Sequence, residues 1–495
     1  MNESFILFIS PKAHVAGDVL LRRINMMWPE VFDHRGVSMV LVAVLVVILL
    51  AGLACTWFLF VQSSAGNGLP GQPSFLTAST PTQELGCSNV IPYDESAPPA
   101  YQGMYTSLGQ ILDNFNQTLS GIQPVASHGV IYATELLPAD SNIGDRLLSP
   151  QAMQGVINYL NAIQKLGIDG VTIDISYPVL VPTFPNYNQY LNFYESVVQQ
   201  VRSRGMKIDV ESETPLLVGY PGLPLGSVSY ANLTYSTYVS EDRAMIQTVI
   251  ADLHPDYLNI GTETDTLQAL LHYPEISTPQ GWGAYINSLL TGLNKGSTKI
   301  DVGIGSWDPI SYLYATLNDS AVDAIDVHVY PVYGSYLSIL TRIGERSEEY
   351  NKPIVIDEMW LHKSIMNEGH NFATDAEISA RNLYAFWIPL DEEFFQLMSK
   401  YAQDFNVAYV SPFEGTYLFA YLNYTYNSAN IPFYEARQVA GRAAGYSIAN
   451  GLISPLGCYY QDLIDNLTTH STSLASFQTA IRPASKLCES ITDFI

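Results

Sequence analysis

Two glutamates, each directly after an apolar run, are the residues of this chain best suited to chemistry. Glu263 closes the segment Asn259-Ile-Gly-Thr-Glu263, and Glu358 closes the segment Ile354-Val-Ile-Asp-Glu358. Two carboxyl groups that flank one acetal bond can cleave it, because one protonates the leaving oxygen while the other attacks the anomeric carbon. In a retaining reaction the two groups lie about 5–5.5 Å apart. We therefore expect Glu263 and Glu358 to form a catalytic pair.

A third polar pattern, Asp326-Val-His328-Val-Tyr330, accompanies this pair. Side chains alternate with period two in a strand, so Asp326, His328 and Tyr330 share one face. A phenol at Tyr330 can hydrogen-bond Glu358 and keep it ionised, while a drier setting and the neighbouring charge raise the pKa of Glu263. For His328 two interpretations stay open, a contact with substrate and a buried histidine whose hydrogen bonds are satisfied.

Further candidates are aromatic or acidic residues near other strand ends. Trp307, in Gly305-Ser-Trp-Asp, either stacks on a sugar ring or packs within its loop. The acidic residues either bind hydroxyl groups or cap the helices that follow them. They are Glu135, Asp174, Glu211 and Glu213. The expected chemistry requires neither a metal nor an organic cofactor, and no Cys/His spacing in the chain indicates zinc.

Eight short apolar segments alternate with longer helical patterns from about residue 126 onward, which is typical of βαβ units and a parallel sheet. The predicted strands are Gly129–Glu135, Gly170–Ser176, Lys207–Ser212, Tyr257–Glu263, Lys299–Gly305, Ala324–Tyr330, Pro353–Glu358 and Val407–Phe413. The predicted helices are Gln151–Leu166, Tyr190–Arg204, Glu241–Leu253, Trp282–Asn294, Tyr336–Tyr350, Asp375–Leu397 and Phe433–Asn450.

This repeat predicts an α/β fold of the (β/α)8 barrel type, in which the active site lies at the carboxyl ends of the strands. The alternative is a doubly wound open sheet. Such a sheet usually carries a Gly-rich phosphate loop after its first strand, but Leu-Leu-Pro-Ala-Asp-Ser follows Glu135. The barrel is therefore the preferred fold.

Glutamates at the ends of strands four and seven, with His-x-Tyr on strand six, resemble the clan A retaining glycoside hydrolases. These include endo-mannanases, endo-galactanases and cellulases, and the resemblance covers roughly residues 126–450. It implies that Glu263 is the acid/base and Glu358 the nucleophile. It also suggests Trp360 as an aromatic platform. Thr262 stands where most members carry an Asn that contacts the sugar 2-hydroxyl, and is a further candidate for binding the carbohydrate substrate.

Residues 37–61 contain no charged residue, and about 20 apolar residues span a bilayer. We predict one transmembrane helix there; the alternative is a cleaved signal peptide. Lys and Arg occur before this segment and then not again until Arg146. This asymmetry places the N-terminus in the cytoplasm and the rest of the chain outside the cell membrane.

The expected organisation is a cytoplasmic segment (1–36), the transmembrane helix (37–61), a stalk with a lead-in helix (62–125), the barrel (126–450) and a C-terminal tail (451–495). An outside location suits glycosylation and a disulfide. Cys458 is expected to pair with Cys488, or Cys87 with either of them. The Asn-x-Ser/Thr sequons lie at Asn116, Asn232, Asn318, Asn423 and Asn466.

The net charge of −25 argues against nucleic-acid binding, because a phosphate backbone selects basic surfaces. The sequence therefore predicts a membrane-anchored extracellular glycosidase of β-linked glycans. One alternative is a non-catalytic glycan-binding or envelope protein on the same barrel. Another is a metal-dependent hydrolase, which would need clustered His and carboxylate ligands. The oligomeric state is left open by the sequence.

Overall fold

A computed structural model describes residues 85–124, 129–331, 334–364, 368 and 371–469 of the chain. The predicted transmembrane helix, 37–61, and Cys488 lie outside these residues. Among the residues that the model describes, no helix combines the length and apolar character needed to cross a bilayer.

Eight parallel strands form one sheet that closes on itself. The sheet order is β1-β8-β7-β6-β5-β4-β3-β2. A bridge between Glu135 and Thr172 joins β1 to β2 and completes the barrel. The predicted (β/α)8 fold is thus confirmed and the open sheet is excluded. The strands are β1 (Ile131–Tyr132), β2 (Gly170–Asp174), β3 (Lys207–Glu211), β4 (Tyr257–Asn259), β5 (Lys299–Gly305), β6 (Ala324–His328), β7 (Ile354–Met359) and β8 (Val407–Pro412).

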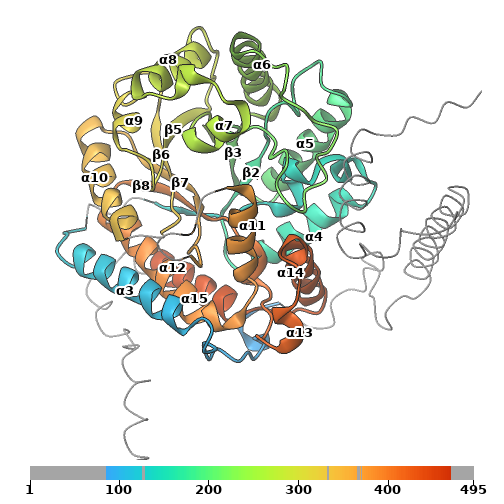
Figure 1. Ribbon diagram of the computed structural model, residues 1–495, viewed down its shortest axis with the longest axis vertical. Coiled ribbons are helices and arrows are strands. Elements are labelled where there is room, and N and C mark those ends of the chain that lie inside the picture. Colours follow the sequence, from blue (N-terminus) through green and yellow to red (C-terminus); the bar gives the residue numbers. More distant parts are fainter. Residues whose placement is uncertain (1–84, 125–128, 332–333, 365–367, 369–370, 470–495) are drawn as a thin grey trace, which may run out of the picture. The chain divides into compact units, whose positions relative to one another are not determined.

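Helices surround the strands, as Figure 1 shows. The longer helices bury apolar side chains in the core, as with the buried Trp282 and Tyr285 of α8. The helices of the barrel are α4 (Ala152–Lys165), α5 (Tyr187–Arg202), α6 (Tyr235–Thr248), α7 (Thr264–Leu271), α8 (Pro279–Leu290), α9 (Ser311–Tyr314), α10 (Gly334–Tyr350), α11 (Phe372–Arg381), α12 (Ile388–Asp404), α13 (Tyr426–Ala429) and α14 (Phe433–Ala449).

The predicted helix Asp375–Leu397 is wrong, because two helices occupy this region. α11 ends at Arg381 and α12 begins at Ile388. Pro389 lies in the first turn of α12. Proline has no backbone N–H to donate and restricts the residue before it, so it starts a helix more readily than it continues one.

Segments on both sides of the barrel in sequence pack against it. Helix α3 (Gln102–Leu119) lies against α10 and α12, and α15 (Pro455–Thr469) lies against α12. A disulfide joins Cys87 to Cys458, which is one of the pairings expected from the sequence. Val90 forms a parallel bridge with Ile453 beside it. The described part of the predicted stalk therefore belongs to the folded barrel.

The interior of the barrel changes from apolar to polar along the strands. At one level Ala133, Tyr257, Ala324, Val355 and Tyr409 form a small apolar cluster. Farther toward the carboxyl ends the interior carries hydrogen-bonded polar side chains, among them the Thr172 hydroxyl, which donates to Ser411 at 2.9 Å. Such an interior positions polar groups directly beneath the mouth where the strands end.

Candidate active site

Glu263 and Glu358 come together at the mouth of the barrel, where both contact the same imidazole nitrogen. His328 Nδ1 lies 3.0 Å from Glu263 Oε1 and 3.3 Å from Glu358 Oε2. The two carboxylate oxygens are therefore at most 6.3 Å apart, which is the total of those two distances. This bound is compatible with the separation of about 5–5.5 Å between the carboxyl groups of a retaining pair. The spatial arrangement fits a pair that acts on one bond.

Glu358 is oriented by a phenol and by an irregularity in its strand. The Tyr330 hydroxyl donates to Glu358 Oε2 at 2.6 Å, as the sequence predicted. The register between β7 and β8 shifts between Ile356 and Met359. Asp357 and Glu358 both contact His328 across this shift, so two consecutive side chains reach the barrel interior. A bulge of this kind is a common way to aim a functional side chain.

Glu263 stands where the chain passes from β4 into α7. It is the N-cap residue of α7, and the Thr266 hydroxyl donates to Glu263 Oε2 at 2.6 Å. The unpaired backbone N–H groups of a helix N-terminus favour negative charge. The carboxylate is therefore held by local structure as well as by His328.

His328 is fully buried and lies among four carboxyl groups. Besides its contacts with Glu263 and Glu358, its Nε2 lies 3.2 Å from Asp357 Oδ1 and 3.6 Å from Asp326 Oδ2. Burial lowers the pKa of His328, but Glu358 and Asp357 outweigh burial and raise this pKa well above its ordinary value. His328 is therefore a buried imidazolium held by carboxyl groups, which favours a buried histidine over a direct contact with substrate, although its Nε2 makes no hydrogen bond among the described residues.

The protonation of the pair in the free protein differs from the sequence-based expectation. Burial raises the pKa of Glu358 to about 7, although His328 and Tyr330 lower it. Burial also raises the pKa of Glu263, but the hydrogen bond and charge of His328 outweigh burial and lower it overall. The expected raised pKa of Glu263 is thus wrong. Below about pH 7 the two carboxyl groups therefore retain one proton, which belongs to the pair more than to either residue.

Aromatic side chains line the mouth around Tyr330. The Trp307 ring centroid lies 5.9 Å from that of Tyr330, and Trp307 Nε1 donates to Asp265 at 3.0 Å. His362 and Phe413 also pack against Tyr330, at 4.6 and 6.0 Å between centroids. Trp307 is partly exposed, so its stacking on a sugar stays a prediction. His362 was missed, because it follows β7 outside any strand pattern.

Two predicted substrate-binding residues do not reach the mouth. Trp360 is fully buried, packed against Phe395 of α12 and against Tyr417. The shifted register of β7 turns it toward the helices, so the prediction of an aromatic platform at Trp360 is wrong. Thr262 is also fully buried, and its hydroxyl donates to Asp326 inside the barrel. The prediction of a substrate contact at Thr262 is therefore wrong as well.

The polar groups beneath the pair form a network that the sequence analysis missed in part. Asn259 Nδ2 donates to Asp326 at 2.9 Å and to Asp357 at 2.8 Å. Asn259 Oδ1 accepts from the backbone N–H of Gly261. The signal for Asn259 was available, since it lies four residues before Glu263 and period two places both on one face of the predicted strand Tyr257–Glu263. Asp357 carried no such signal, because alternation places it opposite Glu358.

Acidic residues from β1 to β3 face the same mouth. Glu135, Glu211 and Glu213 are all buried, and Glu358 is among the groups that raise their pKa values beyond the effect of burial. Asp174 is held differently, because it accepts hydrogen bonds from Ser141, Asn142 and Ser176. It serves the structure of the loop, whereas the three glutamates are candidates for substrate contact.

Some of these side chains are close enough together to hold a metal ion. Ligand atoms of Glu211, His328 and Glu358 lie within 4.8 Å of one another, as do those of Asp209, Asp301 and Asp357 deeper in the barrel. Carboxyl groups that retain protons can approach one another equally closely.

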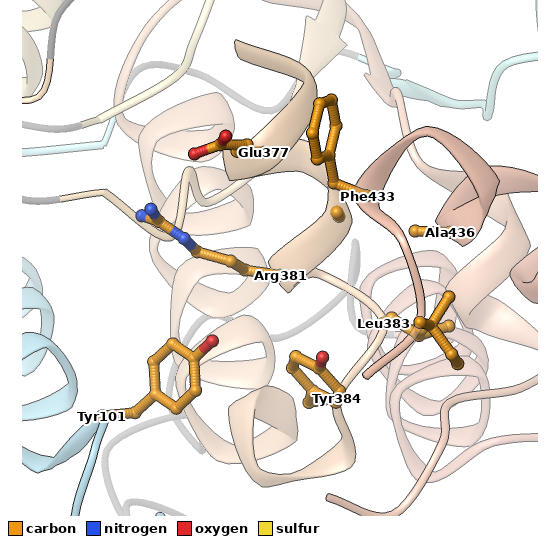
Figure 2. Close-up of a pocket in the computed structure, with 9 residues that line it drawn as sticks. Tyr101, Glu377, Arg381, Leu383, Tyr384, Phe433 and Ala436 are labelled. Carbon is orange, nitrogen blue, oxygen red and sulfur yellow. The ribbon is translucent and has the colours of Figure 1, made fainter. Parts of the chain in front are cut away.

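A separate hollow of about 160 Å³ lies between α11, α14 and Tyr101 (Figure 2), and no member of the catalytic pair or its network lines it.

No family model matches the sequence, and no curated protein matches it. Similar solved structures include GH5_18 from Bifidobacterium longum subsp. longum, with 14% identity, a TM-score of 0.44, and coverage of 69% of this chain and 79% of that one. GH5_18 from Streptomyces cattleya in complex with GlcNAc has 12% identity, a TM-score of 0.46, and coverage of 70% and 82%. An exo-beta-1,4-mannosidase from Opitutaceae bacterium strain TAV5 has 12% identity, a TM-score of 0.46, and coverage of 71% and 62%. These values are low, so function must be inferred from the residues of this chain.

Proposed function

We propose that this protein is a retaining glycoside hydrolase of β-linked carbohydrates, with Glu358 as nucleophile and Glu263 as acid/base. The observation that carries the proposal is the approach of both carboxylates to one nitrogen of His328, at 3.0 and 3.3 Å. A protein that only binds glycans has no need for two carboxyl groups in this arrangement. The geometry therefore favours catalysis over the alternative of a non-catalytic surface protein.

His328 also offers a route by which the shared proton can reach Glu263. Protonated His328 first donates its Nδ1 proton to Glu263. The same nitrogen then accepts the proton of Glu358. This exchange leaves Glu358 as a carboxylate beside the Tyr330 hydroxyl and Glu263 as an acid, with the total number of protons unchanged. The pair is then in the state that the first step of a retaining reaction requires.

The reaction follows from the protonated form of Glu263 and the ionised form of Glu358. Glu263 protonates the glycosidic oxygen while Glu358 attacks the anomeric carbon, forming a glycosyl–enzyme ester. Glu263, now ionised, takes a proton from an incoming water molecule, whose oxygen attacks the same carbon and releases Glu358. Two displacements on one carbon return the original anomeric configuration.

The two glutamates can be tested separately with a screen on β-mannan, β-galactan, β-glucan, xylan and chitosan. Glu358→Gln should reduce kcat on any true substrate at least about a thousandfold, because the covalent route is lost. Glu263→Gln should be as damaging on natural substrates but should still form the ester from an activated aryl glycoside, whose leaving group needs no proton. Glu345→Gln on the exposed face of α10 is the matched control. Full activity in Glu358→Gln would refute the assignment.

We further propose that residues 37–61 anchor the protein in a membrane, with the barrel outside the cell. The support is the uncharged 25-residue segment and the basic residues that precede it. The full chain should stay in the membrane pellet after alkaline carbonate extraction and leave it only with detergent. An external protease should degrade the barrel in intact cells. Release by carbonate alone would contradict the anchor.

A further inference from the structure

The wall of the mouth after β1 and β3 contains carboxyl oxygens that have no hydrogen-bond partner among the described residues. Glu135 and Glu211 are 1% and 2% exposed. Both carboxylate oxygens of Glu135 and Oε1 of Glu211 have no hydrogen-bond partner among the residues that the structure describes. Buried polar atoms are almost always paired in folded proteins. The unpaired oxygens therefore point to a ligand group that completes them.

The chemistry of that ligand group follows from what the wall offers. An ionised carboxylate only accepts hydrogen bonds, whereas a sugar hydroxyl both donates and accepts. Burial raises the pKa values of these carboxyl groups, which keeps them protonated unless a positive group lies beside them. An ammonium group has three donors and no acceptor, so beside it the carboxyl groups ionise and only accept. Glu213 adds a third carboxyl group, 5% exposed, to the same wall.

We propose that the site selects a β-linked amino sugar, whose protonated 2-amino group lies between Glu211 and Glu358; this inference rests on the proposed function. The 2-position is adjacent to the anomeric carbon that Glu358 attacks, so its substituent must lie close to the nucleophile. A carboxylate oxygen of Glu211 lies within 4.8 Å of one on Glu358. An ammonium nitrogen between them reaches both within hydrogen-bond distance.

The electrostatics of these carboxyl groups agree with this geometry. Burial raises the pKa of Glu211 well above its ordinary value, and the next largest influences are the carboxyl groups of Glu358, Asp357, Glu213 and Glu135, all in the same direction. His328, the imidazolium near this wall, is already shared by Glu263 and Asp357. A positive group on the substrate would stabilise the ionised form of Glu211.

The test compares two tetrasaccharides that differ at the 2-position alone, the β-1,4-linked tetramer of glucosamine and cellotetraose. Binding is measured by calorimetry to the full-length Glu263→Gln variant, in detergent, at about pH 5, where an amine of this kind is protonated. A chelator is present so that no metal ion occupies the same carboxyl groups. We expect the glucosamine tetramer to bind at least about tenfold more tightly, as one charge-assisted contact would give.

The contribution of Glu211 is tested by adding Glu211→Gln to the same background. The amide is nearly isosteric but carries no charge, so the preference for the amino sugar should fall below about threefold. Glu345→Gln in that background should keep the tenfold preference, and thermal melting of each variant checks folding. Equal affinity for the two tetramers, or no binding of the glucosamine tetramer, overturns the inference. That outcome is independent of the glycosidase proposal, because binding to this variant requires no cleavage.

Discussion

At the scale of single residues, the site is organised around the imidazole of His328. Its Nδ1 contacts both members of the catalytic pair, and its Nε2 lies near Asp357 and Asp326. Four carboxyl groups around one buried imidazole keep it protonated. The protonation of Glu263 and Glu358 is consequently linked through His328, so a change at any of these residues should alter the pH dependence of catalysis.

The hydrogen bond from Tyr330 provides a direct test of this linkage. Tyr330→Phe removes the 2.6 Å bond to Glu358, which stabilises the ionised form of that carboxyl group. The pKa of Glu358 should rise, so the acidic limb of the pH profile of kcat/KM should move to higher pH. A hydrogen bond to a charged group contributes about 1.5–3 kcal/mol, so kcat/KM should fall about 10- to 100-fold.

Tyr312→Phe is the control for this prediction. The Tyr312 hydroxyl donates to the backbone carbonyl of Ser277 at 2.9 Å, away from the catalytic pair. Its removal should leave the pH profile in place. An unchanged acidic limb in Tyr330→Phe would show that the phenol does not govern the ionisation of Glu358.

The functional residues that the sequence predicted are those that obey two simple regularities. Glu263 lies four residues beyond the end of β4, and His328 and Tyr330 share one face of the segment that contains β6. Period two and the polarity of strand ends were therefore sufficient to find them. Trp360 fails because the register of β7 shifts before it. A bulge depends on pairing with the neighbouring strand, which a single segment of sequence does not reveal.

At the scale of elements, the mouth depends on the close approach of β5 and β6. Gly303 pairs with Asp326 in this register, and a Cβ on Gly303 would overlap the carbonyl oxygen of Asp326. Gly303→Ala should therefore separate the two strands and destabilise the protein by about 1–3 kcal/mol, as overpacking in a core does. Urea denaturation measures the free energy of unfolding.

The displaced strand carries His328 two residues beyond Asp326, so Gly303→Ala should also lower kcat. Gly226→Ala is the control, because nothing lies within 4 Å of a Cβ built at Gly226. Equal stability of the two variants would contradict the close packing of β5 against β6.

Elements were predictable to the extent that local pattern determines them. β5 has its predicted bounds, Lys299–Gly305, since seven residues alternate without interruption. The single predicted helix over Asp375–Leu397 merged α11 with α12, because the apolar period continues across the break. Pro389 marked the boundary and was the available signal.

At the scale of the whole molecule, acidic groups dominate both the surface and the barrel interior. The net charge is −25. Asp209, Asp301 and Asp326 are fully buried, and burial followed by neighbouring aspartates raises their pKa values well above the ordinary value. These carboxyl groups retain their protons in the folded state, whereas they ionise in the unfolded chain above about pH 4.

This difference predicts that these three carboxyl groups stabilise the folded protein more at acidic than at neutral pH. The stabilising contribution of each group is fully present below about pH 4, the unfolded pKa, and is lost as pH rises toward the folded pKa. Each group lowers the free energy of unfolding by up to about 1.4 kcal/mol per pH unit in that range. Urea denaturation at about pH 4 and at about pH 7 should show the higher stability at the lower pH.

Asp209→Asn should reduce this dependence on pH, because an amide does not titrate and Asp209 has no hydrogen-bond partner to lose among the described residues. Asp252→Asn at an exposed position is the control and should leave the dependence unchanged. Stability that increases from about pH 4 to about pH 7 would contradict protonated carboxyl groups in the interior.

The assembly of distant segments was the least predictable feature at this scale. The Cys87–Cys458 disulfide spans 371 residues, and sequence spacing alone left three pairings open. Likewise, the packing of α3 and α15 against α12 depends on the finished barrel surface. The alternation of side chains in strands and the helical period predict each element separately. They do not predict which other elements it packs against.

Mass spectrometry of a trapped glycosyl–enzyme tests the central claim most directly. The protein is incubated with activated 2-deoxy-2-fluoro-β-glycosides, whose fluorine slows hydrolysis of the ester, and is then digested and sequenced. The label should lie on the peptide that contains Glu358 and should be absent in Glu358→Gln. A label on Glu263, or turnover of these glycosides with inversion and no labelled peptide, would contradict the assignment of Glu358 as the nucleophile.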